Sequence, residues 1–218
     1  MPVTTIAIIE DHPIYSKGLT QLINTRKEFT VIGDSDSSCG AISLVEEKKP
    51  DLVIIDLNLG NEDGLELIKN LKALFPALRM LVLSMHDERY YAERVLRAGA
   101  RGYIMKEEAG SRIIDAIETV MAGKIWLSDS ERERLFDSMA GGRFSPDDEE
   151  KQDSLKKLSD RQLQIFTLIG KGLGTIEIAS NLGLSAKTVG THKEHIKSKL
   201  DCPTIQDLRQ LAIKLTNT

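Results

Sequence analysis

Leu52-Val53-Ile54-Ile55-Asp56 is the stretch that decides the fold: four consecutive apolar residues followed directly by an acid. A strand with one face in water alternates apolar and polar residues, whereas a strand covered on both faces is apolar throughout. Four further apolar or β-branched runs recur, at residues 5–9, 29–33, 80–83 and 102–104, and stretches with helical periodicity separate them. The pattern predicts an α/β domain: a doubly wound, five-stranded parallel sheet with helices on both faces, ending near residue 125.

The composition is that of an ordinary globular protein. Of 218 residues, 41% are hydrophobic and 28% are charged, which excludes a chain disordered throughout and a collagen-like repeat. No apolar run approaches the ~20 residues that cross a bilayer, and no basic region precedes the first apolar stretch. Cys39 and Cys202 match neither a disulfide framework nor the spacing of zinc ligands. We therefore expect a soluble protein of the reducing cytoplasm, without membrane association.

Charge and composition divide the chain into three segments. Residues 1–125 carry 15 Lys and Arg against 19 Asp and Glu, whereas residues 156–218 carry 10 against 5. Residues 126–155 read as a linker, because a short helix at about 130–139 precedes a glycine pair, a proline and an acidic run. A basic end on an acidic body is a reason to consider nucleic-acid binding, although a solvated basic face on a helical domain is the commoner explanation of such a charge pattern.

The segment 156–218 is predicted to be an all-α domain of four helices, marked by their start signals. These signals are the capping-box pattern of Ser159 and Gln162, the possible caps Thr175 and Ser185, and Thr204 with Asp207. The middle of the domain reads as a helix-turn-helix, with helices at 176–181 and 185–199. In this motif the second helix lies in the major groove of DNA.

The second helix of the motif has an apolar face for the core and a polar face for DNA. Its three lysines suit phosphate contacts, which give affinity without sequence information. The residues expected in the core are Val189, His192, Ile196 and Leu200. The residues expected to contact DNA are Lys187, Thr188, Gly190, Thr191, Lys193, Glu194 and Lys197.

Polar groups stand where the strands of the first domain end. In a doubly wound sheet, function collects outside the carboxyl ends of the strands. Four of the five strands are followed there by such groups: Glu10 and Asp11, Asp56, Ser84 and Lys106. A single acid at a strand end is commonly a helix cap, but four strand ends would have to acquire such groups independently.

This set of groups suits phosphoryl transfer to a carboxylate. Three acids close together hold a hard divalent cation such as Mg²⁺ through oxygen ligands. Asp56 is then the nucleophile, Lys106 the cation for the phosphoryl oxygens, and Ser84 a hydroxyl donor to one of them. The resulting acyl phosphate would draw the loops of Ser84 and Lys106 inward, which makes a switch.

With Asp63-Gly64 added, these residues resemble the receiver domain of bacterial two-component response regulators, over residues 1 to about 125. The resemblance implies a flavodoxin-like fold with strand order 2-1-3-4-5 and a histidine kinase as phosphodonor. It also implies that Tyr103 changes rotamer on phosphorylation and that the backbone carbonyl of Asn58 joins Glu10, Asp11 and Asp56 around the metal. Such a domain promotes only its own phosphorylation and dephosphorylation, so we expect no enzyme activity on other molecules.

The basic tail is similar to the LuxR-type DNA-binding domain, and together the two domains resemble the NarL/FixJ class of response regulators. This resemblance implies that the partners are double-stranded DNA and, when the chain is phosphorylated, a second copy that forms a homodimer. The last helix, at residues 204–215, pairs the two tails in such proteins, although its apolar stripe is also needed for the core.

Several positions depart from the patterns of these families. In the receiver, Gly60 stands where proline is frequent, and Glu10 stands where aspartate is also common. In the tail, Gly174-Thr175-Ile176 replaces a polar and basic group, and the base-reading positions fall near Gly190, Thr191 and Glu194. Glycine has no side-chain donor, and glutamate can accept a hydrogen bond only from cytosine.

The leading hypothesis is a transcription factor controlled by phosphorylation of Asp56. One alternative is a regulator with the same receiver whose tail binds a protein instead of DNA, motivated by Gly190 and Glu194. The other is a phosphohydrolase that passes through phospho-aspartate, although Asn58 stands where that chemistry usually has a second acid. A flavin-binding domain is less favoured, because the acids after the first strand would repel a phosphate.

Overall fold

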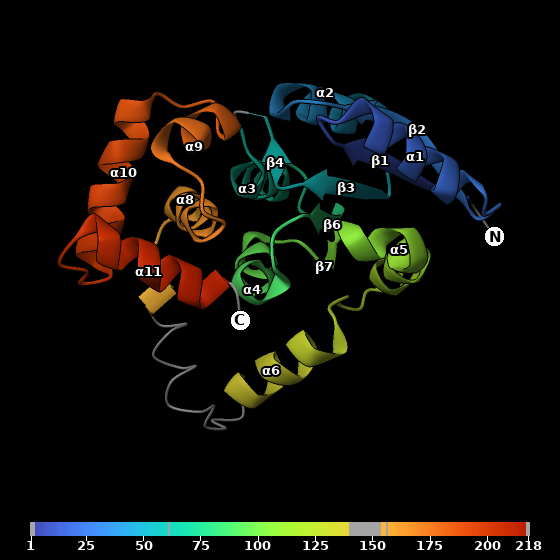
Figure 1. The fold of residues 1–218 in the computed structure, drawn as a ribbon. Helices are drawn as coiled ribbons and strands as arrows, with labels where there is room; N and C mark the ends of the chain where they lie inside the picture. The colour runs from blue at the N-terminus through green and yellow to red at the C-terminus, as the bar shows by residue number, and fades with distance from the viewer. Residues whose placement is uncertain (1–2, 61, 140–153, 156, 217–218) are drawn as a thin grey trace. The chain divides into compact units, whose positions relative to one another are not determined.

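The structure is a computed structural model that describes residues 3–60, 62–139, 154–155 and 157–216. The chain divides into two compact units, Met1–Phe136 and Asp137–Thr218 (Figure 1). The division falls within helix α6(Asp129–Met139). None of the helices in the described part of the chain combines the length and the apolar character that a bilayer span needs.

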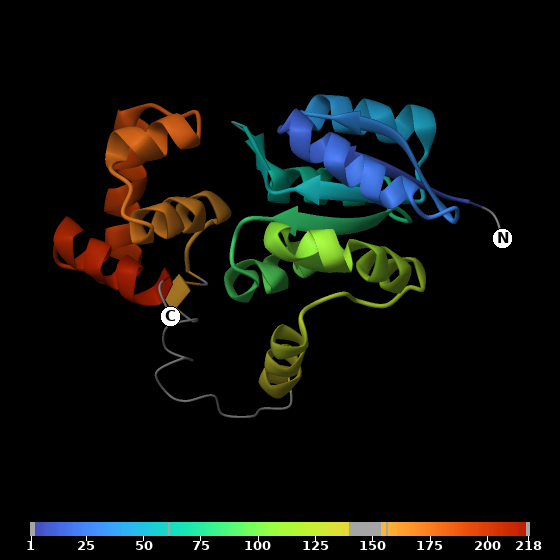
Figure 2. The ribbon, with the colours of Figure 1, turned by 45° about the vertical axis from the view of Figure 1, so that its right-hand side comes forward.

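The first unit is built on a five-stranded parallel sheet in the order β2-β1-β3-β6-β7, seen between its helices in Figure 2. When only the five strands of this sheet are numbered along the chain, the order is 2-1-3-4-5, as expected. The predicted α/β fold is therefore confirmed. The strands are β1(Thr4–Ile9), β2(Phe29–Ser35), β3(Leu52–Asp56), β6(Arg79–Ser84) and β7(Gly102–Met105). The helices are α1(Pro13–Asn24), α2(Ser38–Lys48), α3(Gly64–Leu74), α4(Glu88–Ala98) and α5(Lys106–Met121).

Helices cover both faces of this sheet. Helices α1 and α5 pack together on one face, and α3 lies between α2 and α4 on the other. The apolar residues of β3 are at most 1% exposed, as expected for a strand buried on both sides. The chain leaves β1 toward β2 on one side and enters β3 on the other, so the strand order reverses between β1 and β3. Ligand sites of open α/β sheets lie at this switch point, outside the carboxyl ends of the strands.

A small hairpin follows β3, and the sequence pattern did not predict it. Strands β4(Asn58–Leu59) and β5(Glu62–Asp63) pair antiparallel beside the site. Gly60 in its turn has a φ of +55°, a conformation that favours glycine. Gly64 then opens α3 so close to β3 that a Cβ atom there would lie 2.6 Å from the carbonyl oxygen of Asp56. Gly64 therefore allows α3 to begin in close contact with the chain that carries Asp56.

After α5 the chain returns to the edge of the sheet. Trp126 bridges to Gly102, its carbonyl accepts the N–H of Tyr103 at 3.0 Å, and its own N–H donates to Arg101. The short helix expected at about 130–139 is α6. The remainder of the expected linker, except Leu155 and Ser154, lies outside the described residues.

The described residues 157–216 of the second unit form four helices, as predicted: α8(Asp160–Gly170), α9(Thr175–Asn181), α10(Ala186–Lys199) and α11(Ile205–Thr216). Ser159 and Gln162 form the expected capping box, and Ser185 caps α10. The prediction of Thr175 as a cap was wrong. Helix α9 begins at Thr175 and its N-cap is Gly174, because the carboxylate of Glu177 accepts the N–H of Gly174 at 2.6 Å.

Candidate phosphoryl-transfer site and DNA-binding helix

The acids predicted from the strand ends lie together in the first unit. Ile9 and Ile55 pair in neighbouring strands, so Glu10 and Asp11 leave β1 beside Asp56 at the end of β3. Among the described residues, Glu10, Asp11, His12 and Asp56 each offer one ligand atom, and these atoms all lie within 4.8 Å of one another. Glu10 is 4% exposed and Asp56 is 2% exposed. Negative charge is therefore concentrated at this edge of the sheet, and the carboxylates of Glu10 and Asp56 have little access to water.

Lys106 carries the balancing positive charge. It is the first residue of α5, and its Nζ donates to Asp56 Oδ2 at 2.8 Å and to Glu10 Oε2 at 2.6 Å. Its side chain is only 7% exposed. An ammonium buried between two carboxylates is the compensation that buried acids require. The structure thus brings the nucleophile candidate and the cation candidate into direct contact.

Burial and charge shift the protonation equilibria of both partners. Burial raises the pKa of the Asp56 carboxyl to about 6, with Lys106 and the N–H of Asn58 opposing the shift. Burial alone would lower the pKa of Lys106, but Asp56 and Glu10 outweigh it, so the pKa of the ammonium is raised. At neutral pH the pair is therefore a carboxylate and an ammonium.

Further backbone contacts hold the acids in place. Asp56 Oδ1 accepts the N–H of Asn58 at 3.0 Å, and Asp11 Oδ2 accepts the N–H of Gly60 at 2.9 Å. The glycine in the loop after the nucleophile candidate, Gly60, is thus bonded to a metal-ligand candidate. Asp11 is itself half-buried.

Two histidines belong to the surroundings of the site, and sequence reasoning assigned them no role. His12 Nδ1 lies 3.0 Å from Glu10 Oε1 and 2.8 Å from Asp11 Oδ1, and these acids raise its pKa. His86 is buried, its Nε2 lies 3.1 Å from Asn58 Oδ1, and its ring stacks on Tyr91. The signal available in the sequence was proximity, since His12 follows the acid pair and His86 stands two residues after Ser84.

The two switch candidates meet at the backbone of His86. Ser84 ends β6 and its Oγ accepts the N–H of His86 at 3.2 Å. Tyr103 is 0% exposed, and its hydroxyl donates to the carbonyl of His86 at 2.6 Å. Burial raises the pKa of this hydroxyl well above its ordinary value, so it remains a donor. Ser84 and Tyr103 therefore hold one segment of the chain from two strands.

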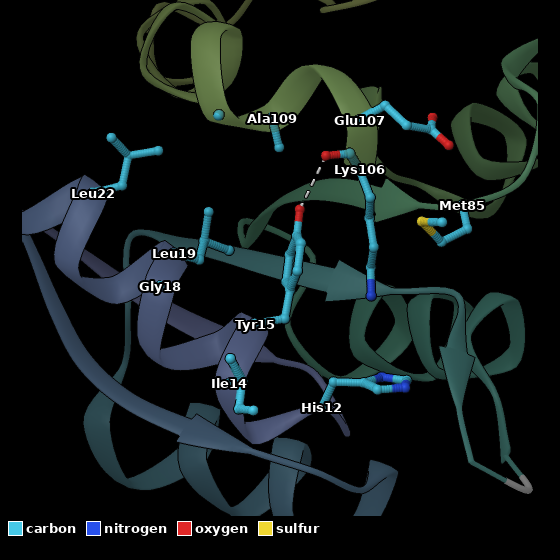
Figure 3. Close-up of a pocket in the computed structure, with 11 residues that line it drawn as sticks. His12, Ile14, Tyr15, Gly18, Leu19, Leu22, Met85, Lys106, Glu107 and Ala109 are labelled. Atoms are coloured by element: carbon cyan, nitrogen blue, oxygen red, sulfur yellow. Dashed lines mark hydrogen bonds between the residues drawn. The ribbon is translucent and has the colours of Figure 1, made fainter.

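An apolar groove of about 770 Å³ opens beside Lys106, between α1 and α5 (Figure 3). The groove shares two residues with the site, His12 and Lys106. Its other lining residues are Ile14, Tyr15, Gly18, Leu19, Leu22, Met85, Glu107, Ala109 and Gly110. Ile14 is 88% exposed and Met85 is 50% exposed, so the rim presents apolar side chains to solvent.

In the second unit, the predicted DNA-contacting residues lie on α10, but several of them contact other side chains. Lys193 Nζ donates to Thr175 Oγ1 at 2.9 Å, and Lys197 pairs with Glu194 at 2.6 Å. The side chain of Thr188 bonds to Ser185 at the start of the helix. Lys187, Thr188, Thr191 and Glu194 are exposed, whereas Gly190, Lys193 and Lys197 are half-buried. Val189 and Ile196 are fully buried, as predicted for the core face.

Comparison with known proteins gives the same two parts. Residues 6–118 match the response regulator receiver domain, and residues 156–212 match the bacterial regulatory proteins of the luxR family. The oxygen regulatory protein NreC of Staphylococcus haemolyticus is 34% identical over 210 residues, which cover 96% of each chain. NreC of Staphylococcus aureus (strain MRSA252) is 33% identical over the same share of both chains.

Solved structures of response regulators have the same fold. A LuxR-family two-component response regulator from Aurantimonas sp. SI85-9A1 covers 63% of this chain and 99% of its own, with 28% identity and a TM-score of 0.59. RcsB of Salmonella typhimurium, in the structure of a single-residue variant, covers 98% of this chain and all of its own, with 26% identity and a TM-score of 0.58. RcsB bound to the promoter rprA in the presence of the phosphomimetic BeF3⁻ has a TM-score of 0.63 at 23% identity, covering 97% of this chain and 98% of its own.

A receiver fold with an acid cluster, followed by a helix-turn-helix unit, defines a DNA-binding transcription regulator controlled by phosphorylation. The chain belongs to the response regulator family, in the class that joins a receiver domain to a LuxR-type domain. The family is one of transcription regulators.

Proposed function

We propose that Asp56 accepts a phosphoryl group from a histidine kinase, and that phosphorylation promotes a homodimer whose tails bind double-stranded DNA. The observation that carries this proposal is the convergence of Asp56, Glu10, Asp11 and Lys106 from three separate strand ends. The receiver domain then spans residues 1–125, a linker spans 126–155, and the DNA-binding domain spans 156–218. DNA as the target places the chain in the cytoplasm.

The donor set fits Mg²⁺. Three carboxylates with ligand atoms within 4.8 Å of one another offer the hard oxygen ligands that this ion prefers. Glu10, Asp11 and Asp56, with the carbonyl of Asn58, would hold it. When bound, the ion supplies positive charge that offsets the charge of the phosphoryl group.

The residues of the chain then orient and stabilise the transfer. Asn58 and Lys106 each hold one oxygen of the Asp56 carboxylate, which fixes its direction. As an oxygen of Asp56 bonds to phosphorus, the phosphorus–nitrogen bond of the donor phosphohistidine breaks, and the released imidazole takes a proton. Lys106 and the hydroxyl of Ser84 stabilise the phosphoryl oxygens. The receiver acts in this way on its own aspartate, and later on its own acyl phosphate, and on no other substrate.

The groove beside Lys106 is the approach for the phosphodonor. It opens beside Lys106 and His12, and an apolar rim of Ile14 and Met85 suits contact with an apolar helix of the kinase. A histidine on that helix would reach the acid cluster over the rim, whereas a small phosphodonor needs no such surface.

Phosphorylation then acts as a switch through Ser84 and Tyr103. A phosphoryl oxygen on Asp56 accepts a hydrogen bond from the Ser84 hydroxyl and draws it toward the site, and the segment whose His86 N–H donates to the oxygen of that hydroxyl moves with it. Movement of that segment changes the carbonyl that holds Tyr103, and a change in the Tyr103 rotamer transmits the state to the surface.

In the tail, α10 is the helix that enters the major groove, and its exposed polar residues make the DNA contacts. The luxR-family match over residues 156–212 favours DNA over a protein as the target of the tail. RcsB, which has the same fold, has been solved on promoter DNA with a phosphomimetic. Lys187, Lys193 and Lys197 contact phosphates, and Thr188, Gly190, Thr191 and Glu194 lie nearest the bases.

The test is labelling by a small-molecule phosphodonor with Mg²⁺. Asp56→Asn abolishes labelling, because the amide is not a nucleophile toward phosphorus. Asp115→Asn, which changes an exposed acid on α5 in the same way, leaves labelling intact. Stoichiometric labelling that persists in Asp56→Asn would show that the nucleophile is another residue.

A further inference from the structure

The Lys106 ammonium is enclosed on two sides by carboxylates, and the ring of Tyr15 lies close to it. Lys106 Nζ lies 4.5 Å from the centroid of the Tyr15 ring. The Tyr15 hydroxyl also donates to the backbone carbonyl of Lys106 at 3.3 Å (Figure 3). One side chain of α1 therefore contacts both ends of the same lysine on α5.

We propose that Tyr15 is a positioning residue for Lys106 in phosphoryl transfer. This inference rests on the proposed function. A lysine ammonium is strongly hydrated and sits on a flexible stem, so its position must be imposed by its surroundings. Tyr15 and Lys106 line the same groove, and the ring of Tyr15 attracts the ammonium while occupying the space through which water would reach it.

The hydroxyl of Tyr15 has a separate effect. It ties the first residue of α5 to α1, and so fixes the backbone from which the Lys106 side chain starts. Burial raises the pKa of this hydroxyl, which keeps it a neutral donor. The ring determines where the ammonium lies, and the hydroxyl determines where the helix begins.

The experiment compares Tyr15→Leu and Tyr15→Phe with the unaltered chain, using acetyl phosphate at saturating Mg²⁺. Tyr15→Leu removes the ring and lowers the phosphorylation rate constant about three- to tenfold, with Mg²⁺ affinity unchanged within about twofold. Tyr15→Phe keeps the ring and stays within about twofold of the unaltered rate. Tyr90→Leu removes another half-buried tyrosine ring that faces a cation, Arg89, and leaves the rate unchanged.

Repeating the Tyr15→Leu change in a Lys106→Met variant separates the positioning of Lys106 from a general effect on packing. In Lys106→Met, the further change Tyr15→Leu has no additional effect on the rate, because the group it positions is absent. Equal slowing by Tyr15→Leu with and without Lys106, or no slowing with Lys106 present, overturns the inference. Absence of labelling in the unaltered chain would instead contradict the proposed function.

An independent observation concerns α6, which is attached to the first turn of α4. Glu88, the first residue of α4, is 8% exposed, and its Oε1 accepts the N–H of Ser128 at 3.0 Å. Arg134 Nε donates to the carboxylate of Glu131, which is 2% exposed, at 2.7 Å. Arg134 Nη2 reaches the carbonyl of Arg89 at 3.4 Å. Glu88 and Glu131 are therefore buried carboxylates that do not belong to the acid cluster.

We infer that this contact is a latch that passes the state of the receiver to α6, the helix that leads toward the tail. Residues 84–89 carry the contacts of Ser84 and Tyr103 at one end and the contacts to α6 at the other. A shift of His86 on phosphorylation therefore moves Glu88 and Arg89, which lie two and three residues later. This inference also rests on the proposed function.

Hydrogen–deuterium exchange of the full chain, with and without beryllium fluoride and Mg²⁺, tests the latch. Beryllium fluoride changes exchange across residues 128–136 severalfold in the unaltered chain. Glu88→Gln keeps the side-chain shape but weakens the bond to Ser128, and reduces that difference at least twofold. Arg132→Gln alters an exposed arginine of α6 and leaves the difference intact.

The outcomes separate the two levels of the proposal. A ligand-induced change at residues 84–86 and 106 without any change at 128–136 overturns the latch and leaves the receiver function standing. A difference that persists in full in Glu88→Gln also overturns it. No response anywhere in the receiver would contradict the proposed function itself.

Discussion

The acid cluster of the receiver and the outer face of α10 were both predicted from residue types, but their surroundings differ. In the receiver, Asp56, Glu10 and Lys106 are nearly inaccessible to solvent, and each contacts another member of the site. On α10, Lys187 and Thr191 are exposed, and the contacts of Lys193 and Glu194 are with neighbouring side chains. The contacts of the first site exist without any ligand, whereas the outer face of α10 keeps exposed side chains for the contacts with DNA that we propose.

This difference determines which interactions are strong. Charges buried together interact through a low effective dielectric, so removing one leaves the others uncompensated. Exposed charges are screened by water and salt, and each contributes little until DNA displaces the solvent. Large effects of substitution are therefore expected in the receiver and small, salt-dependent ones on α10.

Lys106→Met breaks the balance of the acid cluster and gives the largest effect. Phosphorylation by acetyl phosphate falls roughly 100-fold, because a cation for the phosphoryl oxygens is lost. The affinity for Mg²⁺ rises at least about fivefold, because the ammonium that bonds to Asp56 and Glu10 no longer competes with the ion for these carboxylates. Calorimetric titration of Mg²⁺ and the labelling rate measure the two effects.

The metal-free stability of the same variant provides the check. Loss of Lys106 leaves buried carboxylates unpaired and lowers the free energy of unfolding of the receiver by about 3 kcal/mol, and added Mg²⁺ restores part of it. Lys17→Met, at an exposed position of α1, changes neither quantity. Weaker Mg²⁺ binding in Lys106→Met would show that the lysine does not compete with the metal.

Gly64 in the receiver and Gly190 on α10 differ in the space that an added side chain would find. A Cβ at Gly64 would lie 2.6 Å from the Asp56 carbonyl oxygen and from Leu57 Cα, whereas a Cβ at Gly190 meets nothing within 4 Å. Gly64→Ala therefore costs the receiver about 1–3 kcal/mol and slows phosphorylation, because the backbone that carries Asp56 must shift. Gly190→Ala stabilises α10 by about 0.5–1 kcal/mol. Denaturant unfolding measures both, and the same sign at both positions would contradict the contrast.

The sheet and the acid cluster could be predicted because topology places strand ends together. Continuous apolar runs identified β3 and its neighbours, and the polar residue after each run had to lie at the same edge of the sheet. No such rule places Tyr15 or His86, which reach the site from α1 and from the loop after β6 through packing. The β4–β5 hairpin is two residues per strand, too short for alternation to be seen.

The tail shows the same limit. Ser159 with Gln162 was predictable, because a capping box is a local pattern. Thr175 was predicted as the N-cap of α9, but the N-cap is Gly174, whose N–H donates to the carboxylate of Glu177. The hydroxyl of Thr175 instead accepts a hydrogen bond from Lys193 on α10. Local hydrogen-bond patterns fix a helix start to within one residue, and contacts between helices decide the rest.

Salt dependence of DNA binding distinguishes two lysines of α10. Lys187→Gln weakens binding evenly across sequences and reduces the salt slope by about one unit, because an exposed ammonium is free to contact a phosphate. Lys193→Gln reduces the slope less, because Lys193 is half-buried and its bond to Thr175 competes with a phosphate. Titrations of a promoter fragment at several salt concentrations measure the slopes, with the exposed receiver lysine in Lys27→Gln as charge control. Equal slopes for Lys187→Gln and the unaltered chain would remove Lys187 from the contact set.

The smallest expected effect is a difference in pKa between two histidines, His12 beside the acid cluster and His192 on α10. The hydrogen bond to Glu10 and the charge of Asp11 raise the pKa of His12, whereas burial and the positive charge of Arg161 lower the pKa of His192. Protonation of His12 thus stabilises the folded receiver below pH ~6.5, and that contribution is lost as pH rises through the folded pKa. For His192 the folded state favours the neutral ring, so the tail loses stability as pH falls below ~6.5.

NMR titration of the histidine Cε1–H signals in the full chain, assigned with His12→Gln and His192→Gln, measures both values. We expect the pKa of His12 above and that of His192 below the ordinary ~6.5. Added Mg²⁺ lowers the pKa of His12, because a cation among Glu10, Asp11 and Asp56 takes the charge that held the proton, and it leaves His192 unchanged. A Mg²⁺-dependent shift of His192 equal to that of His12 would contradict the assignment of the Mg²⁺ effect to the acid cluster.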